Sequence, residues 1–115
     1  MKVLVCGGRD YADKARVNEA LGIVHRKCKI TELIHGAARG ADTLAGEWAK
    51  ENGIKVSAFP ADWEKHKKAA GPIRNQKMLD DAKPEAVVAF PGGSGTNDML
   101  LRAQLSGLKI WKPYG

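Results

Sequence analysis

The chain has 115 residues, which is enough for one domain with a single hydrophobic core. Its 43% hydrophobic content is typical of a globular protein, and its net charge of +6 favours anionic ligands. No apolar run has the length of a membrane span, and the N-terminus carries no signal-peptide pattern, so we expect a cytoplasmic protein without a membrane partner. Its two cysteines, Cys6 and Cys28, give no disulfide framework, and both are expected to be buried thiols.

Strand and helix patterns alternate along the whole chain. Short apolar runs predict strands at Lys2–Cys6, Glu32–His35, Lys55–Phe59, Ala86–Phe90 and Lys109–Trp111. Apolar residues at helical spacing predict helices at about 17–28, 41–49, 72–82 and 96–106. The longest irregular stretch is expected at residues 60–71, before Pro72 opens the third helix.

This alternation predicts an α/β fold with parallel strands and helices on both faces. We expect residues 1–115 to form a single Rossmann-like three-layer domain with a five-stranded parallel sheet in the order 3-2-1-4-5. The first and fourth strands are then central neighbours, and the winding direction reverses between them. Ligands bind at the carboxyl ends of strands at such a switch point.

A glycine-rich turn after the fourth strand is the strongest candidate for an anion site. It comprises Pro91, Gly92, Gly93, Ser94, Gly95 and Thr96. Glycines allow the backbone to approach a phosphate, and the helix start offers unpaired N–H groups. Ser94 and Thr96 are expected to cap the helix and to donate to phosphate. Asp98, expected in its first turn, either stabilises the helix dipole or meets a sugar hydroxyl.

The turn after the first strand, Gly7, Gly8, Arg9 and Asp10, is predicted to reach the same crevice. Arg9 could clamp a phosphate with two hydrogen bonds. Asp10 could accept a hydrogen bond from a ribose hydroxyl or from Arg9. The structural alternative is a tight turn with an N-capping aspartate.

The turn after the second strand has almost no side-chain bulk. It runs from His35 through Gly36, Ala37, Ala38, Arg39 and Gly40 to Asp42. Such a loop either packs tightly or admits a flat ligand. Asp42 suits a helix start, Arg39 could reach a phosphate, and His35 is either a general base or a residue bonded to the backbone.

Arg74 and Asn75 open the third predicted helix. Helical spacing relative to Met78 turns Arg74 inward or toward the crevice, where a guanidinium requires an anion. Trp63 and His66 could belong to a flap over the crevice, with Trp63 stacked on a base or half-buried in packing. No metal-ligand spacing, no Walker lysine and no dinucleotide fingerprint is present, so no metal and no cofactor is expected.

Four segments together resemble the SLOG superfamily, which includes the LONELY GUY phosphoribohydrolases, the DNA-processing protein DprA and the YspA-like proteins. They are GGRDY at 7–11, HGAARGADTLAGEWA at 35–49, PADWEKHKKAAGPIRNQKM at 60–78 and FPGGSGT at 90–96. The likeness is greatest to the small YspA-like branch of bacteria and phages. The resemblance implies a Rossmann-like fold and a nucleotide or nucleotide-derived ligand.

The LONELY GUY enzymes hydrolyse the N-glycosidic bond of nucleoside 5′-monophosphates, with a PGGxGTxxE motif and an arginine from the preceding helix. Arg74 resembles that arginine, and the turn at 92–96 resembles the phosphate loop. The position of the catalytic glutamate holds Met99, which cannot act as a carboxylate does. This departure counts against hydrolysis and leaves nucleotide binding untouched.

Three functions therefore stay open. The first is binding of a phosphoribosyl or ADP-ribose-like ligand, as a sensor or sequestering module. The second is a nucleotide N-glycosidase, in which Arg74 holds the phosphate and Asp10 or Asp98 acts at the ribose. The third, which charge and DprA likeness allow, is single-stranded DNA binding; nucleic acid is the least favoured partner because few aromatics are available to stack. A homodimer through the third and fourth predicted helices is also expected.

Overall fold

The computed structural model describes residues 1–115 and confirms the α/β fold with a parallel five-stranded sheet. The strands are β1 (Lys2–Cys6), β2 (Glu32–His35), β3 (Lys55–Ala58), β4 (Ala86–Ala89) and β5 (Lys109–Trp111). Their order is β3-β2-β1-β4-β5, and every pair is parallel. The winding reverses between β1 and β4, as the sequence predicts.

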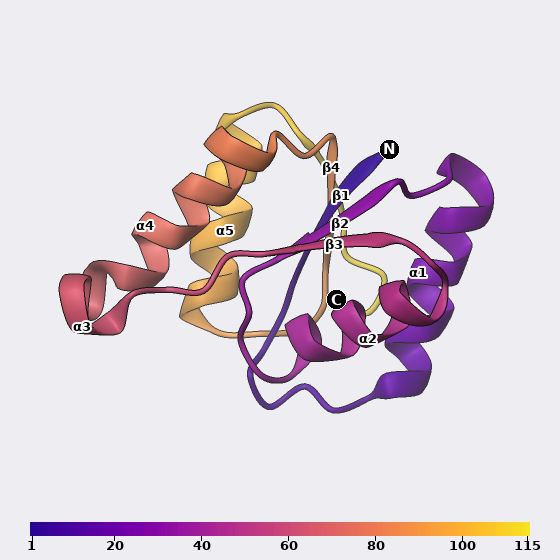
Figure 1. The fold of residues 1–115 in the computed structure, drawn as a ribbon, viewed down its shortest axis with the longest axis horizontal. Helices are drawn as coiled ribbons and strands as arrows, with labels where there is room; N and C mark the ends of the chain where they lie inside the picture. The colour runs from indigo at the N-terminus through magenta and orange to yellow at the C-terminus, as the bar shows by residue number, and fades with distance from the viewer.

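Helices cover both faces of the sheet and give three layers (Figure 1). They are α1 (Lys14–Cys28), α2 (Ala41–Glu51), α3 (Trp63–His66), α4 (Ala70–Lys77) and α5 (Ser94–Leu105). α1 and α2 lie on one side of the sheet, and α4 and α5 lie on the other. None of these helices combines the length and the hydropathy that a membrane span requires.

The alternation of side chains along β1 divides the core into two clusters. Val3 and Val5 point to the α1–α2 face, where they pack with Leu21 and Trp48. The intervening Leu4 points to the α4–α5 face, among Met78, Met99 and other apolar residues. Because both faces of a central parallel strand are buried, β1 is continuously apolar rather than alternating.

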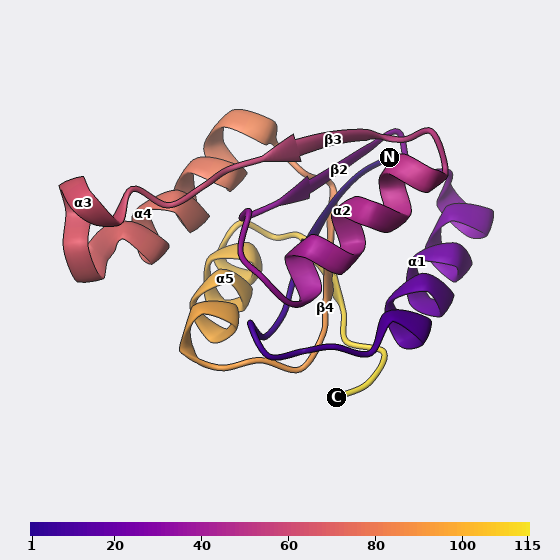
Figure 2. The same cartoon turned by 60° about the horizontal axis from the view of Figure 1, so that its bottom comes forward.

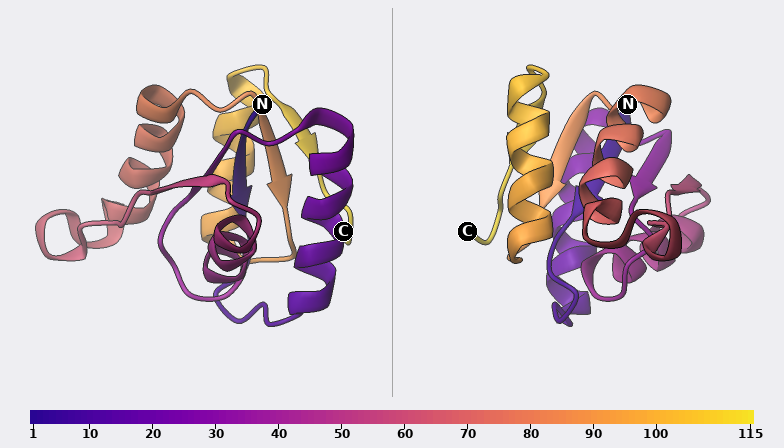
Figure 3. Two further views of the ribbon diagram at one scale, coloured as in Figure 1. Left: turned by 45° about the vertical axis from the view of Figure 1, so that its right-hand side comes forward. Right: turned by 90° about the vertical axis from the view of Figure 1, so that its left-hand side faces the viewer.

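The segment between β3 and α4 differs from the expected irregular stretch. The Asp62 side chain accepts a hydrogen bond from the Lys65 amide and caps the short helix α3. A 3-10 turn, η1 (Lys67–Ala69), leads from α3 directly into α4. Pro72 lies in the first turn of α4, where its missing N–H removes no hydrogen bond. Figures 2 and 3 show α3 projecting beyond the layer of α4.

Three local expectations are wrong. Helix α5 begins at Ser94 rather than Thr96, so Asp98 lies in its second turn. Neither Ser94 nor Thr96 caps the helix: Gly93 is the N-cap and no side chain bonds there. Cys28 is exposed, because it lies at the end of α1, while Cys6 is buried. A π-helical turn, η2 (Met78–Ala82), extends α4 toward Pro84.

Candidate functional site

The three glycine-rich turns meet at the carboxyl edge of the sheet, on either side of the switch point. The amide of Gly8 donates a 2.8 Å hydrogen bond to the carbonyl of Pro91. The Gly8 carbonyl in turn accepts from the amide of Ala41, at 3.2 Å. The turn after β1 therefore lies between the turns after β2 and β4 and is bonded to both.

This close approach explains the need for glycine at two positions. A Cβ on Gly8 would lie 2.9 Å from the Pro91 carbonyl oxygen, well inside van der Waals contact. Gly40 has a φ of +81°, and a Cβ there would collide with the Gly8 carbonyl. The backbone frame of the site thus depends on residues without side chains.

Asp42 holds the turn after β2 in place. Its Oδ2 accepts hydrogen bonds from the amides of Gly36 (3.0 Å) and Ala38 (3.2 Å). Burial raises the pKa of Asp42 to about 6, although these amides and the charges of Arg74 and Arg9 act in the opposite direction. Asp42 thus shapes the turn with its carboxylate and gives the site a buried titratable group.

His35 is buried at the end of β2 and is bonded to the backbone, the structural alternative for this residue. Its Nδ1 accepts a 2.9 Å hydrogen bond from the Ala37 amide, so this nitrogen carries no proton. Burial, aided by the charge of Lys50, lowers the pKa of His35. The ring is therefore neutral and its basic nitrogen is already occupied.

Arg74 reaches from α4 across to the turn after β2. Its Nη1 donates to the carbonyl of Gly36, and its Nε donates to Oδ1 of Asn75 at 2.9 Å. Burial lowers the pKa of Arg74, and the nearby charge of Asp42 partly restores it. The bonds of Nη1 and Nε hold the guanidinium in position, and its Nη2 makes no hydrogen bond to the protein. The Nη2 donors are therefore free to bind an anion.

Asn75 connects Arg74 to the phosphate-loop candidate. It is only 3% exposed, and its Nδ2 donates to the carbonyl of Gly95 (3.2 Å) and to Oδ2 of Asp98 (2.9 Å). All the hydrogen bonds that Asn75 makes thus go to protein groups. The residue holds the start of α5 against α4.

Asp98 is engaged in the same network. Its Oδ2 also accepts a 2.8 Å hydrogen bond from Nε of Arg102, and Nη1 of Arg102 donates to Oε1 of Gln76. Burial acts to raise the pKa of Asp98, but the bonds from Arg102 and Asn75 outweigh it and lower the pKa. Sequence reasoning missed Arg102 and Gln76, although the four-residue spacing of Asp98 and Arg102 on one helix is a signal for this ion pair.

Arg9 and Asp10 point in separate directions from the first turn. The Arg9 guanidinium lies 5.2 Å from the centre of the Trp63 ring, a cation–π contact with α3. Asp10 pairs with Arg39 at 3.4 Å, and both side chains are largely exposed. Asp10 is therefore a surface carboxylate whose partner is Arg39 rather than Arg9.

The turn after β4 presents its backbone to solvent. Pro91, Gly92, Gly93, Ser94 and Gly95 are exposed, while Thr96 is buried behind them. The first amides of α5 have no intrahelical acceptor and face an accessible surface. No group of three or more His, Cys, Asp and Glu side chains is arranged to hold a metal ion.

The sheet order and the three turns at its switch point define a Rossmann-like α/β protein. The profile of the YspA, cpYpsA-related SLOG family (YAcAr) matches residues 1–66. The chain also shares 37% identity over 117 residues with the Gene 61 protein of Mycobacterium phage D29, covering 95% of this chain and 93% of that protein. The chain belongs to the YspA, cpYpsA-related SLOG family.

A solved structure shows the same fold at low sequence identity. The DNA processing protein A (DprA) from Streptococcus pneumoniae superposes with a TM-score of 0.53 and 19% identity. The match covers 96% of this chain and 58% of the DprA chain, so the protein spans little more than half the length of that structure. At this identity the likeness shows the fold alone.

Proposed function

We propose that the protein binds a nucleotide or nucleotide-derived ligand, phosphoribosyl or ADP-ribose-like, at the edge formed by the turns after β1, β2 and β4. The proposal rests on the position of the Arg74 guanidinium. This group is held at Gly36 and Asn75, and Nη2 makes no hydrogen bond to the protein. Asn75 in turn bonds to the carbonyl of Gly95 in the exposed turn after β4. A fixed guanidinium beside free helix-start amides is suited to a phosphate.

The aromatic side chain at the rim supports a ligand larger than phosphate. Trp63 is 48% exposed and lies beside Arg9, the residue that follows Gly8, whose amide bonds to Pro91. A half-exposed indole next to a guanidinium provides a surface on which a nucleobase can stack. We therefore assign the phosphate end of the ligand to the turn after β4 and its base to Trp63.

Binding fits this arrangement better than hydrolysis. Met99 is 1% exposed and lies in the core, and one oxygen of Asp98 already accepts two hydrogen bonds. Asp10 lies in solvent beside Arg39. Asp42 is the buried carboxylate of the site, but its Oδ2 already accepts hydrogen bonds from the amides of Gly36 and Ala38 and holds the turn after β2. A role as sensor or sequestering module follows from binding without turnover.

Calorimetry against a panel of nucleoside monophosphates and ADP-ribose tests the proposal. We expect saturable binding to at least one of them and at least a tenfold loss of affinity for Arg74→Gln, since a charge-assisted hydrogen bond contributes roughly 1.5–3 kcal/mol. Arg26→Gln is the matched control, because Arg26 is exposed at the far end of α1. No binding at millimolar ligand, or equal affinity in both variants, would overturn the proposal.

A further inference from the structure

An apolar hollow lies away from the glycine-rich turns, on the α1 side of the sheet. α2 packs on β1, β2 and β3, whereas α1 lies beside β4 and β5 and leaves a hollow between itself and these strands. Val88 of β4 and Trp111 of β5 are neighbours in the register, so both point to this face. They form the floor and one wall of an apolar groove whose other wall is α1.

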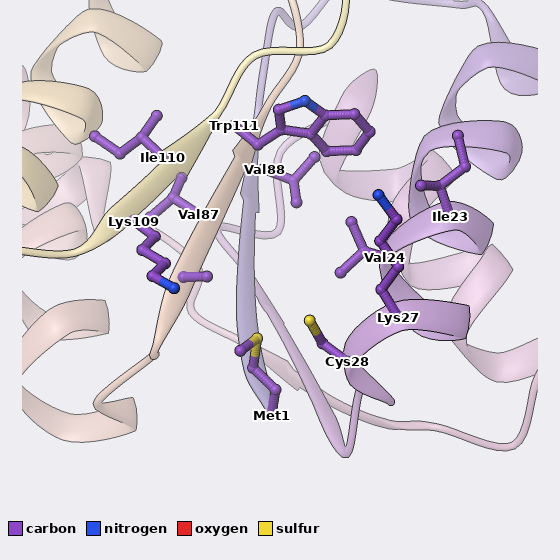
Figure 4. A pocket seen from close by; sticks show the side chains of 11 residues that line it. Met1, Ile23, Val24, Lys27, Cys28, Val87, Val88, Lys109, Ile110 and Trp111 are labelled. Atoms are coloured by element: carbon purple, nitrogen blue, oxygen red, sulfur yellow. The ribbon is translucent and has the colours of Figure 1, made fainter.

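The groove has a volume of about 600 Å³, and nine of its eleven lining residues are hydrophobic. Figure 4 shows Ile23, Val24 and Cys28 of α1 on one side, Trp111 on the other and Met1 at one end. Trp111 is 39% exposed, a large apolar side chain left partly in water. Walls on two sides and a volume in the range of small-molecule sites fit a narrow apolar body rather than a flat protein surface.

The charged side chains that line the groove are both cationic. They are Lys27, in the last turn of α1, and Lys109, at the start of β5. No carboxylate lines the groove. Long lysine stems can lie along an apolar wall and keep the ammonium group in water, where it meets the charged end of a ligand.

We propose that this groove binds a small amphipathic anion, with an alkyl or aryl body over Val88 against Trp111 and Val24, and a carboxylate or sulfonate near Lys27 and Lys109. Burial of the ligand's apolar body against the lining supplies most of the affinity. The two lysines make the groove prefer ligands with a negative charge over ligands with a positive charge. This site is separate from the glycine-rich edge, so it does not depend on the proposed nucleotide function.

A titration with hexanoate, octanoate and decanoate, followed by amide NMR, tests the proposal. We expect shifts confined to α1, β4 and β5, and an affinity that rises roughly two- to fourfold for each added CH₂. Octylammonium, of the same length and opposite charge, is expected to bind at least fivefold more weakly than octanoate. The single accessible thiol gives a second readout: decanoate should slow the alkylation of Cys28 by iodoacetamide, while Cys6 is buried in both states.

Two pairs of variants separate the groove from nonspecific binding. Lys27→Gln/Lys109→Gln should abolish the preference for octanoate over octylammonium, whereas Lys14→Gln/Lys50→Gln, at exposed sites elsewhere, should keep it. Trp111→Ala should weaken decanoate binding, and Trp63→Ala should not. Absence of saturation, equal binding of both charges by the wild type, or a dimer in light scattering that excludes carboxylates from the groove would each overturn the proposal.

Discussion

Replacing Gly36 with alanine tests the position of Arg74 without removing its charge. A Cβ on Gly36 would lie 2.6 Å from Nη1 and 2.8 Å from Cζ of Arg74. The φ of Gly36 is not in the left-handed region, so the backbone tolerates alanine there. The guanidinium, at the end of a flexible side chain, must therefore move and give up its bond to the Gly36 carbonyl.

The cost can be worked out from that bond. A hydrogen bond to a charged group contributes roughly 1.5–3 kcal/mol to stability. A Gly→Ala change that the backbone tolerates stabilises the fold by roughly 0.4–1 kcal/mol, because alanine lowers the conformational entropy of the unfolded chain. We expect a net destabilisation of roughly 1–2 kcal/mol, which lowers the Tm by about 4–8 °C in a chain of this size. Under the proposed function we also expect nucleotide affinity to fall about tenfold or more, because the guanidinium leaves the position that it holds at Gly36.

Chemical denaturation and calorimetry on four variants measure both effects. In an Arg74→Ala background, Gly36→Ala should be neutral or slightly stabilising, since the group that it displaces is gone. Gly22→Ala is the matched control: it lies in α1, away from the site, and its Cβ would meet only the end of Arg26 at 3.4 Å. The reasoning is refuted if Gly36→Ala is as stable as Gly22→Ala and binds nucleotide as the wild type does.

Four further outcomes follow from the structure. Burial raises the pKa of Asp42 from 3.8 to about 6, so between these pH values the folded chain retains a proton that the unfolded chain releases. This difference contributes about 3 kcal/mol to the free energy of unfolding below pH 4, and the contribution is lost as the pH rises through 6. Asp42→Asn should remove that slope in urea denaturation, and an unchanged slope contradicts the assignment. Sulfate, which does not titrate in this range, should bind more tightly at pH 5 than at pH 7 in the wild type but not in Asp42→Asn, by calorimetry. Gly40→Ala should lower stability by at least roughly 2 kcal/mol, because it adds strain at positive φ to a clash with the Gly8 carbonyl. A loss below about 0.5 kcal/mol in the same assay, the size of an ordinary surface effect, argues against the packed frame. Dimerisation stays a prediction, with Ile73, Leu101 and Leu105 exposed on α4 and α5; Leu101→Ser/Leu105→Ser should then yield a monomer by light scattering, and a monomeric wild type refutes it.

The fold could be predicted because its determinants are local. Short apolar runs such as Val3–Val5, punctuated by glycine turns and helical spacing, indicate alternating strands and helices, and the handedness of parallel connections then limits the sheet order. The segment from Pro60 to Gly71 escaped prediction because its helices are short and polar. The capping bond of Asp62 and the packing of the chain against α4 stabilise them, and neither produces a hydrophobic period.

The sequence predicts which residues gather at the candidate site better than it predicts which hydrogen bonds their side chains make. Glycine turns at strand ends indicate where backbones gather, so the meeting of Gly8, Gly40 and Pro91 is a consequence of topology. Which oxygen a side chain binds depends on tertiary distances that no spacing encodes. The sequence thus placed Asn75 and Asp98 near the crevice, but it could not show that they bond to each other.

The bonds that join the Gly8 turn to its two neighbours have a consequence for how ligand preference can change. A rim already assembled from main-chain contacts loses little conformational freedom when a ligand arrives, so most of the interaction energy is available as affinity. The side chains that project from this rim, Arg9, Arg39 and Trp63, carry none of those main-chain bonds. Substitutions at these three positions therefore leave the main-chain contacts of the rim intact. Under the proposed function, such substitutions would change which small molecule the site prefers without changing the fold around it.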